Sequence, residues 1–192
     1  GTYHHLIVSG SGTKTLGGAI TLNGNLSINV GTLSTSTYQI TGNATGTFTM
    51  AASTTLNLGL AASATNVSVP TGFTTGNTTL APTSTVVYLA NYTQTVSSTP
   101  TYGNLTIQTV NGSKTANGAL TVAGILTTTS PSTLSMEGNN LTLTGAYAGT
   151  GALSFTSGAF NIGGAFTNTG TYTCGTGTVT YNGAAQTVRG VN

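Results

Sequence analysis

The sequence predicts an all-β protein and, within that class, a β-solenoid (β-helix) of short strands built from about two repeats of roughly 95 residues. Apolar residues recur in pairs separated by one residue, turn-forming residues flank most of these pairs, and the sequence repeats itself. Helix-forming residues are scarce, and no apolar stripe with a helical period is present. A β-sandwich assembled from the same repeats is the alternative fold.

The expected strands follow the apolar pairs in chain order. Alternation of apolar and polar residues places the apolar side chains on one face of each strand, and that face is buried. Gly, Asn, Ser and Thr between the pairs supply the turns. Strands of about three to five residues are short for a sandwich, whereas a solenoid stabilises each of them by pairing with the coils above and below. The pairs are Leu6/Val8, Ile20/Leu22, Leu26/Ile28, Tyr38/Ile40, Phe48/Met50, Leu56/Leu58, Val67/Val69, Leu105/Ile107, Leu120/Val122, Leu141/Leu143, Leu153/Phe155 and Phe160/Ile162.

One motif occurs intact in the middle of the chain and again in two pieces, one at each end. The intact copy covers residues 84–126, residues 178–188 repeat its first part, and residues 3–24 repeat its second part. A chain divided across its own repeat is suited to continue into another copy of itself, which predicts a fibre. Equivalent residues are Tyr88 and Tyr181, Gln94 and Gln186, Val96 and Val188, Tyr102 and Tyr3, Leu105 and Leu6, Ile107 and Val8, and Lys114 and Lys14.

The repeat also sets the expected domain organisation. We expect a first repeat over residues 1–99, which begins within the motif, and a second over residues 100–192, which ends within it. No linker rich in Gly, Ser or Pro and no run of charges separates the two repeats. Both should therefore form one continuous body.

The chain is almost uncharged. Charged residues make up 2% of the sequence, where a typical soluble domain has about 25%. Thr, Ser and Asn take their place, and there are 45 threonines. A neutral surface has little self-repulsion and favours association. The charged side chains are Lys14, Lys114, Arg189 and Glu137, to which His4 and His5 add weakly.

This composition argues against an enzyme. The chain has no Asp and a single Glu, so paired carboxylates for acid–base catalysis and a Ser-His-Asp triad cannot be assembled in one chain. Aspartate-rich calcium sites are excluded for the same reason, and no cofactor is implied. His4, His5 and Cys174 give at most three zinc ligands from distant parts of the sequence, where a structural zinc site needs four.

Two classes of partner are also not expected. Three basic residues cannot form a surface that neutralises phosphates, which argues against nucleic acid. No stretch approaches the roughly 18–20 consecutive apolar residues of a membrane span. No signal peptide is recognisable, and the first residue is Gly, which we interpret as processing or as an excerpt from a longer chain.

Five side chains suggest chemistry but have simpler interpretations. His4 and His5 could bind a metal or sense pH at a subunit contact, yet the second copy has no histidine there, which favours an ordinary pair at a strand edge. Lys14 and Lys114 lie in matching Gly-rich segments, where solvated turn lysines are favoured over a Lys–Asn isopeptide crosslink. Cys174 is interpreted as a small buried apolar residue rather than a crosslinking thiol.

Residues 3–16, 18–28 and 177–188 resemble repeats in large secreted surface proteins of Bacteroidota. Those proteins are similar to β-helical adhesins of the filamentous-haemagglutinin kind, and many leave the cell by type IX secretion. The resemblance implies an extracellular or cell-surface location, with a host surface, a glycan or other cells as partners besides further copies of the chain. The C-terminal sorting domain of such proteins is not recognisable in this sequence.

We therefore predict a structural subunit, or a repeat segment, of an extracellular β-rich filament or surface adhesin that assembles head to tail. The open ends of a solenoid expose unpaired backbone groups, which template a further chain. An ice- or surface-binding β-solenoid is the alternative, although Thr-x-Thr sequences recur here at uneven gaps. The expected subunit interface joins one copy to the next through Tyr181, Gln186 and Val188 on one side and Tyr3, Leu6 and Val8 on the other.

Overall fold

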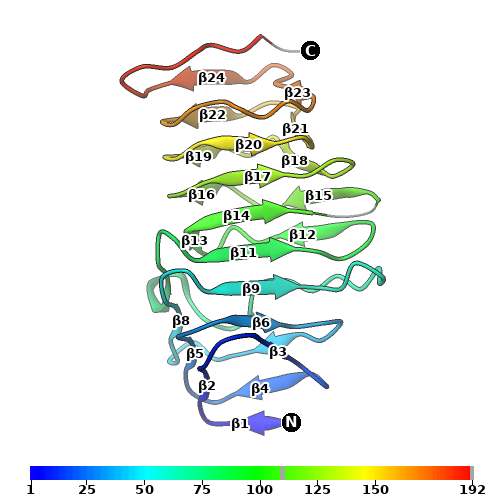
Figure 1. The fold of residues 1–192 in the computed structure, drawn as a ribbon, viewed down its shortest axis with the longest axis vertical. Helices are drawn as coiled ribbons and strands as arrows, with labels where there is room; N and C mark the ends of the chain where they lie inside the picture. Colours follow the sequence, from blue (N-terminus) through cyan, green and yellow to red (C-terminus); the bar gives the residue numbers. More distant parts are fainter. Residues whose placement is uncertain (109–110, 191–192) are drawn as a thin grey trace.

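The computed structural model describes residues 1–108 and 111–190, and within them the chain forms a β-solenoid of about nine turns (Figure 1). All the strand pairs are parallel, as in the pairing of β2 with β5 and of β11 with β14. The described residues contain no α-helix, only a short 3-10 helix, η1 (Thr75–Asn77). No helix there is long and apolar enough to span a membrane. The all-β solenoid expected from the sequence is confirmed.

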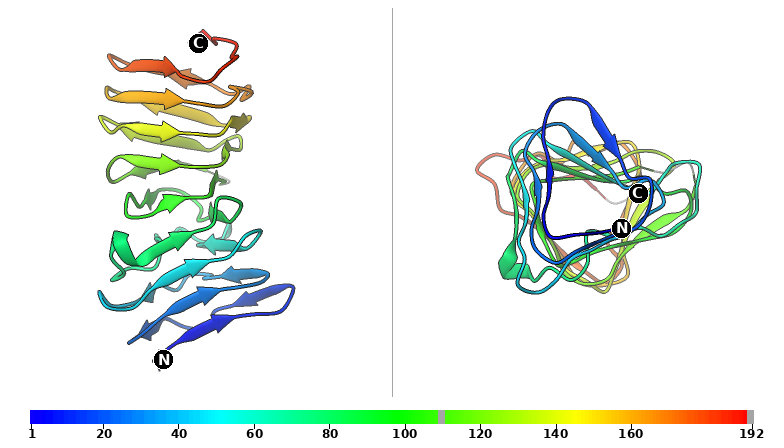
Figure 2. Two further views of the ribbon diagram at one scale, coloured as in Figure 1. Left: turned by 90° about the vertical axis from the view of Figure 1, so that its left-hand side faces the viewer. Right: turned by 90° about the horizontal axis from the view of Figure 1, so that it is seen from below.

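Each coil crosses three faces, and the coils enclose a roughly three-sided cross-section (Figure 2). Face 1 consists of a three-stranded and a five-stranded sheet. Segment 66–71 joins them, because Thr71 bridges to Thr41 on one side and Asn66 bonds to Thr95 on the other. The strands of face 1 are β1 (Thr2–Tyr3), β4 (Ile20–Leu22), β7 (Ile40–Thr41), β12 (Gln94–Val96), β15 (Ser113–Ala116), β18 (Thr133–Glu137), β21 (Ala152–Phe155) and β23 (Tyr172–Thr173).

The other two faces follow face 1 in every coil. Face 2 has a four-stranded sheet followed by a five-stranded one, whereas face 3 is a single seven-stranded sheet. Face 2 contains β2 (Leu6–Val8), β5 (Leu26–Ile28), β8 (Phe48–Met50), β10 (Thr78–Leu80), β13 (Thr101–Tyr102), β16 (Leu120–Val122), β19 (Leu141–Leu143), β22 (Ala159–Ile162) and β24 (Thr178–Tyr181). Face 3 contains β3 (Thr13–Thr15), β6 (Thr32–Ser34), β9 (Thr55–Leu58), β11 (Thr85–Tyr88), β14 (Asn104–Ile107), β17 (Leu126–Thr128) and β20 (Tyr147–Gly149).

The apolar members of each alternating pair point into the tube. Leu26 and Ile28 are fully buried, and in the next coil they pair with the inward-facing Phe48 and Met50. Ser27 between them is only half-buried, because it points outward. The inward side chains of successive coils form one apolar cluster. Alternation in the sequence thus fixes both the strand faces and the core.

Coils differ in length because their corners differ, while their strands stay in register. Lys14 pairs with Leu33, 19 residues later, whereas Leu56 pairs with Val86, 30 residues later. The extra residues of the longer coil lie between β9 and β10. Uneven spacing in the sequence therefore does not prevent even stacking of strands in space.

The two copies of the motif are rotated by one face relative to each other. Lys14 lies on face 3 in β3, whereas its equivalent Lys114 lies on face 1 in β15. In the same way, β4 and β5 on faces 1 and 2 correspond to β16 and β17 on faces 2 and 3. The repeat is therefore not a whole number of coils.

Candidate functional site

The two ends of the solenoid are the candidate site, because each carries strands paired on one side only. In the described chain, β1, β2 and β3 pair only with the coil that follows them, and β23 and β24 pair only with the coil that precedes them. The two ends lie at opposite poles of the molecule (Figure 1). Unpaired strand edges present rows of backbone N–H and C=O groups that can template another strand.

The intact motif in the middle of the chain shows how such edges are joined. β11 pairs with β14, so that Val86 lies beside Leu105 and Tyr88 beside Ile107. The hydroxyl groups of Tyr88 and Tyr102 are 3.0 Å apart in the core. We name this arrangement, formed by residues 85–108 and 111–116, the central joint.

Ser97 closes a hydrogen-bond network around the two tyrosines of the central joint. The Tyr102 hydroxyl donates to the Ser97 carbonyl over 2.6 Å, and the Ser97 N–H donates to the Tyr88 hydroxyl over 3.0 Å. Burial raises the pKa of Tyr88 to about 12, and burial also raises that of Tyr102. Both hydroxyls therefore stay neutral and bonded at physiological pH.

Gln94 braces the corner that precedes β12. Its Oε1 accepts from the Ala90 N–H over 3.2 Å, and its Nε2 donates to the carbonyls of Leu58 (3.1 Å) and Val67. In β12, Gln94 and Val96 pair with Lys114 and Ala116 of β15. Their backbone partners thus lie in β15, one strand after the β14 residues Leu105 and Ile107 that pair with β11.

Lys114 contradicts the expectation of a solvated turn lysine. Its side chain is fully buried, and Nζ donates to the carbonyls of Ala90 and Tyr92, which belong to the corner of the preceding coil. Burial lowers the pKa of Lys114 to about 8. Lys14 instead donates to Gly10 (2.6 Å) and Ser11 (2.5 Å) in its own turn and stays partly exposed.

The C-terminal piece of the motif repeats the first half of the central joint. The Gln186 Oε1 accepts from the Gly183 N–H over 2.5 Å, and Nε2 donates to Ile162 (3.0 Å) and Gly164 (2.6 Å). Ile162 is the strand partner of Tyr181, just as Leu58 is the strand partner of Tyr88.

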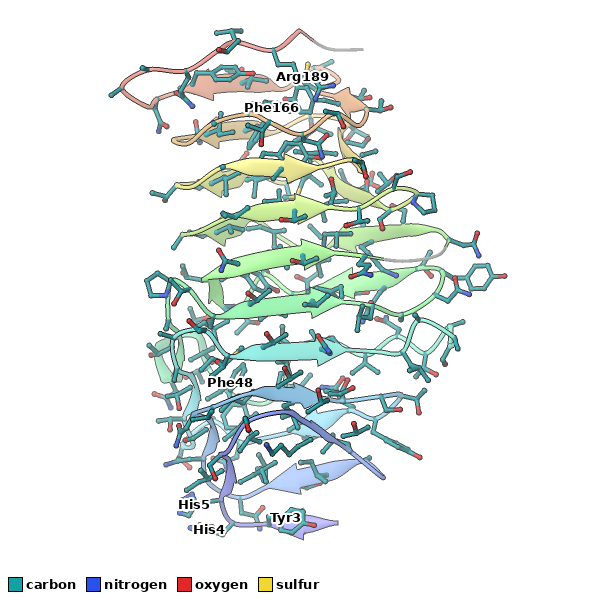
Figure 3. The ribbon with its side chains drawn as sticks, in the orientation of Figure 1. Tyr3, His4, His5, Phe48, Phe166 and Arg189 are labelled. Atoms are coloured by element: carbon teal, nitrogen blue, oxygen red, sulfur yellow. The ribbon has the colours of Figure 1, made fainter. Side chains whose placement is uncertain are left out.

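Arg189 completes this correspondence. Its N–H donates to the Tyr181 hydroxyl over 3.0 Å, as the Ser97 N–H does to Tyr88. Its guanidinium lies 5.3 Å from the centre of the Phe166 ring and donates to Gly170 (Figure 3). From the sequence alone Arg189 is only a charged residue, because its equivalent in the intact copy, Ser97, has a short uncharged side chain.

The N-terminal piece of the motif forms strands that have no paired coil on their outer side in the described chain. Tyr3 and Leu6 line a hollow at this end of the tube together with Leu16 and Ile20. Tyr3 is 52% exposed, whereas its equivalent Tyr102 is fully buried. At the opposite end, Val188 is 71% exposed, whereas its equivalent Val96 is fully buried. The six expected interface residues are therefore divided between opposite ends. Tyr3, Leu6 and Val8 belong to β1 and β2 at one pole, whereas Tyr181 belongs to β24 at the other, and Gln186 and Val188 follow it in the chain (Figure 1).

The two buried side-chain polar atoms without a partner among the described residues both belong to the last coil. They are the hydroxyl oxygen of Tyr172 and Nη1 of Arg189. Buried polar groups normally have hydrogen-bond partners. In the inner coils of the described chain, the buried side-chain polar atoms have such partners.

His5 has a structural task between β1 and β2. Its Nδ1 accepts from the Asn25 N–H over 2.9 Å, as the Asn104 Oδ1 accepts from the Ile125 N–H over 2.8 Å in the second copy. His4 lies beside it, with ring centres 4.3 Å apart and ring planes tilted by 60°. The expected strand-edge role is thus the one that His5 has here.

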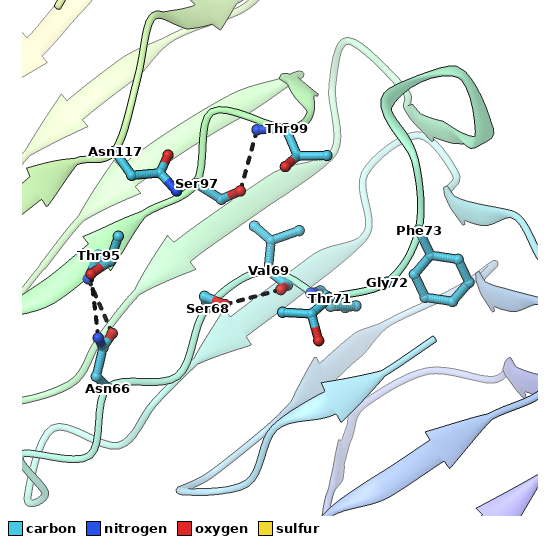
Figure 4. A pocket seen from close by; sticks show the side chains of 11 residues that line it. Asn66, Ser68, Val69, Thr71, Gly72, Phe73, Thr95, Ser97, Thr99 and Asn117 are labelled. Carbon is cyan, nitrogen blue, oxygen red and sulfur yellow. Dashed lines mark hydrogen bonds between the residues drawn. The ribbon is translucent and has the colours of Figure 1, made fainter. Parts of the chain in front are cut away.

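A polar hollow of about 300 Å³ opens on face 1, where segment 66–73 takes the place of a regular strand (Figure 4). Asn66 and Thr95 bond to each other twice across its floor. Its other lining groups include Ser68, Ser97 and Asn117, and no charged side chain contributes. It offers neither a general acid nor a nucleophile activated by a base.

Other chemistry is scarce in the described residues. They contain no group of three or more His, Cys, Asp or Glu side chains that could hold a metal ion. Glu137 accepts from the Ser135 hydroxyl over 2.7 Å, and Cys174 is a half-buried free thiol packed against the core, less buried than expected. Comparisons with protein-family models, curated proteins and solved structures find no match for this chain.

Proposed function

We propose that this chain is a structural subunit, or a repeat segment, of an extracellular β-rich filament or surface adhesin whose copies stack head to tail. One observation carries the proposal: the two ends hold the two halves of a joint that the middle of the chain forms intact. The C-terminal half already has the hydrogen bonds of the central joint around Tyr181 and Gln186. The N-terminal half exposes the complementary residue Tyr3 and leaves Leu6 half-buried.

The order of faces is preserved when a second copy is added. The last coil ends with β24 on face 2 and continues into residues 186–188, which come next in the order of faces. A following copy begins with β1 on face 1 and β2 on face 2. The last coil thus ends on face 3, and the next copy would start on face 1. Stacked copies would therefore continue one solenoid, although the two internal repeats are rotated by one face.

The central joint gives the expected register of this contact. Val86, Val87 and Tyr88 pair with Leu105, Thr106 and Ile107, so we expect Val179, Thr180 and Tyr181 of one copy to pair with Leu6, Ile7 and Val8 of the next. Burying such apolar side chains contributes roughly 1.5–3 kcal/mol each, so no salt bridge is needed. A covalent continuation and a non-covalent contact both satisfy this geometry.

Composition supports the stacking of copies. A surface rich in Thr, Ser and Asn with 2% charged residues has little self-repulsion between stacked copies. The resemblance to secreted surface repeats supports an external location. The chain itself is the primary partner, and a host surface, a glycan or another cell would be met by the outer faces.

Site-directed crosslinking tests the register. In a Cys174→Ser background, Ile7→Cys and Thr180→Cys are made as separate proteins and mixed. Paired positions in neighbouring strands lie about 4.8 Å apart, within the range that a disulfide requires. We expect the mixture to form a disulfide-linked dimer at least ten times faster than either variant alone.

An off-register pair provides the control. Thr178→Cys mixed with Ile7→Cys is displaced by two residues, about 6.6 Å along the strand, and should crosslink poorly. Equal crosslinking of both mixtures, or of neither, would contradict the proposed stacking.

Ice or surface binding remains the second candidate, because the structure aligns a row of threonines that are unevenly spaced in the sequence. Thr13, Thr32, Thr55 and Thr85 are aligned by strand register on face 3. The neighbouring row passes from Thr15 through Ser34 and Asn57 to Val87, which weakens a regular Thr-x-Thr face. Thermal hysteresis from the monomer, abolished by Thr32→Leu with the fold intact, would favour this function over stacking.

A further inference from the structure

The two lysines of the repeat have equivalent positions in the sequence but different partners in the structure. Lys114 is buried and donates to carbonyls of the preceding coil, at Ala90 and Tyr92. Lys14 bends back onto Gly10 and Ser11 of its own turn. The difference has a simple cause: the described chain places no coil beneath Lys14.

A stacked copy would supply that coil. Lys114 pairs with Gln94 in the central joint, so Lys14 would pair with Gln186 of the preceding copy. Ala90 lies two residues after Tyr88, and Tyr92 lies two residues before Gln94. Gly183, two residues after Tyr181, is therefore the equivalent of Ala90. Ala184, two residues before Gln186, is the equivalent of Tyr92.

We propose that the Lys14 ammonium group is a specificity-determining clasp of the joint, which leaves its own turn and donates to the carbonyls of Gly183 and Ala184 in the preceding copy. This inference rests on the proposed head-to-tail stacking and deepens it, because it names the polar contact that fixes the register. A displaced register would leave a buried ammonium without acceptors, which is costly. The clasp therefore stabilises the matching register and disfavours displaced ones.

The apolar surroundings of Lys14 fit this role. Its side chain shares a hollow with Leu6, Leu16 and Leu33 at the open end of the tube. When a second copy closes this hollow, the two local bonds to Gly10 and Ser11 are replaced by two bonds across the joint. The ammonium group thus donates the same number of hydrogen bonds after it has lost contact with solvent water.

Amine acetylation tests the clasp on the unmodified protein. A brief pulse of an acetylating reagent is applied to dilute monomer and to concentrated assembled protein, and modification is read by mass spectrometry. We expect Lys14 to react at least tenfold more slowly in the assembly than in the monomer. Lys114 should be protected in both samples, which provides an internal reference.

The outcomes separate this inference from the proposed function. If sedimentation shows only monomer at every concentration, both the stacking and the clasp are wrong. If the chain assembles but Lys14 reacts as fast as in the monomer, the stacking stands and the clasp is wrong. Slow acetylation of Lys14 in the assembly alone supports both.

A variant gives an independent measurement. Lys14→Met keeps the length of the side chain but removes its donors, so the dissociation constant for assembly should rise at least tenfold. Thr13→Ala, on the outward side of the same strand, should leave it unchanged. An unchanged dissociation constant for Lys14→Met, with thermal unfolding of the monomer as in the wild type, would overturn the clasp.

Discussion

Lys114 carries its amine in the interior of the solenoid, bonded to backbone carbonyls rather than to a carboxylate. Burial lowers its pKa from 10.5 to about 8, because an uncompensated charge is poorly solvated there. The buried tyrosines behave in the opposite sense: burial raises the pKa of Tyr88 and of Tyr147 from 10.0 to about 12. These residues make stability depend on alkaline pH.

The free energy of unfolding should pass through a maximum near pH 10. Between pH 8 and 10 the unfolded chain binds more protons at Lys114 than the folded chain, so stability rises with pH. Above pH 10 the tyrosines of the unfolded chain lose protons that the folded chain retains, so stability falls. Denaturant unfolding at pH 7, 9 and 11 measures both limbs.

The Lys114→Met variant is the control for the rising limb. It removes the titrating amine, so unfolding free energies at pH 7 and 9 should become equal while the fall above pH 10 remains. A wild-type protein with equal stability at pH 7 and 9 would show that Lys114 is not buried as described.

At the scale of elements, the corners between faces 2 and 3 have room only for glycine. Gly103, Gly124, Gly145 and Gly164 follow one another, coil by coil, where face 2 turns into face 3. A Cβ on Gly145 would lie 2.0 Å from the Gly124 carbonyl oxygen, which belongs to rigid backbone. The corner thus depends on close backbone contact between coils.

Substitution at this corner should be costly. Gly145→Ala is expected to destabilise the fold by about 2 kcal/mol, because coils must separate to admit the methyl group. For a chain of this size that corresponds to a fall of roughly 4–8 °C in Tm. Gly76→Ala, where a Cβ would meet nothing within 4 Å, should change Tm little. Equal effects of the two variants would refute the corner argument.

The sequence predicted most strands well and the corners poorly, for a physical reason. Val67/Val69 is an exception, because both side chains are buried but segment 66–71 forms no regular strand. Alternating pairs such as Leu120/Val122 identify inward side chains, and β16 has the expected buried ends. Corners have no period, so nothing distinguished Gly145 from a glycine in an open turn. Lys114 was misjudged because a buried lysine is rare unless paired, and only the fold reveals the carbonyls that receive it.

The candidate site could be predicted only in part. Equivalent residues at the two chain ends were visible from the repeat, and the central contact between Tyr88 and Tyr102 agrees with that alignment. Pairing of Gln94 with Lys114 was not visible, because it depends on which strand lies on which face. The one-face rotation between copies likewise depends on coil lengths that a sequence repeat does not reveal.

At the scale of the whole molecule, the proposed stacking makes the chain one segment of a longer solenoid. About nine coils with an open strand edge at each end give a rod that can be extended without changing its cross-section (Figure 2). Each added copy would lengthen the rod by nine strand spacings, about 43 Å. The outer faces, which carry Thr, Ser and Asn, would repeat with the same period.

Cryo-electron microscopy of the assembled protein measures this directly. We expect unbranched filaments in which strands stack along the axis about 4.8 Å apart and successive copies are related by an axial rise of about 43 Å. Reconstruction should place β24 of one copy beside β2 of the next in the register of the central joint. Absence of filaments, or filaments in which copies associate side by side with their ends exposed, would contradict the account.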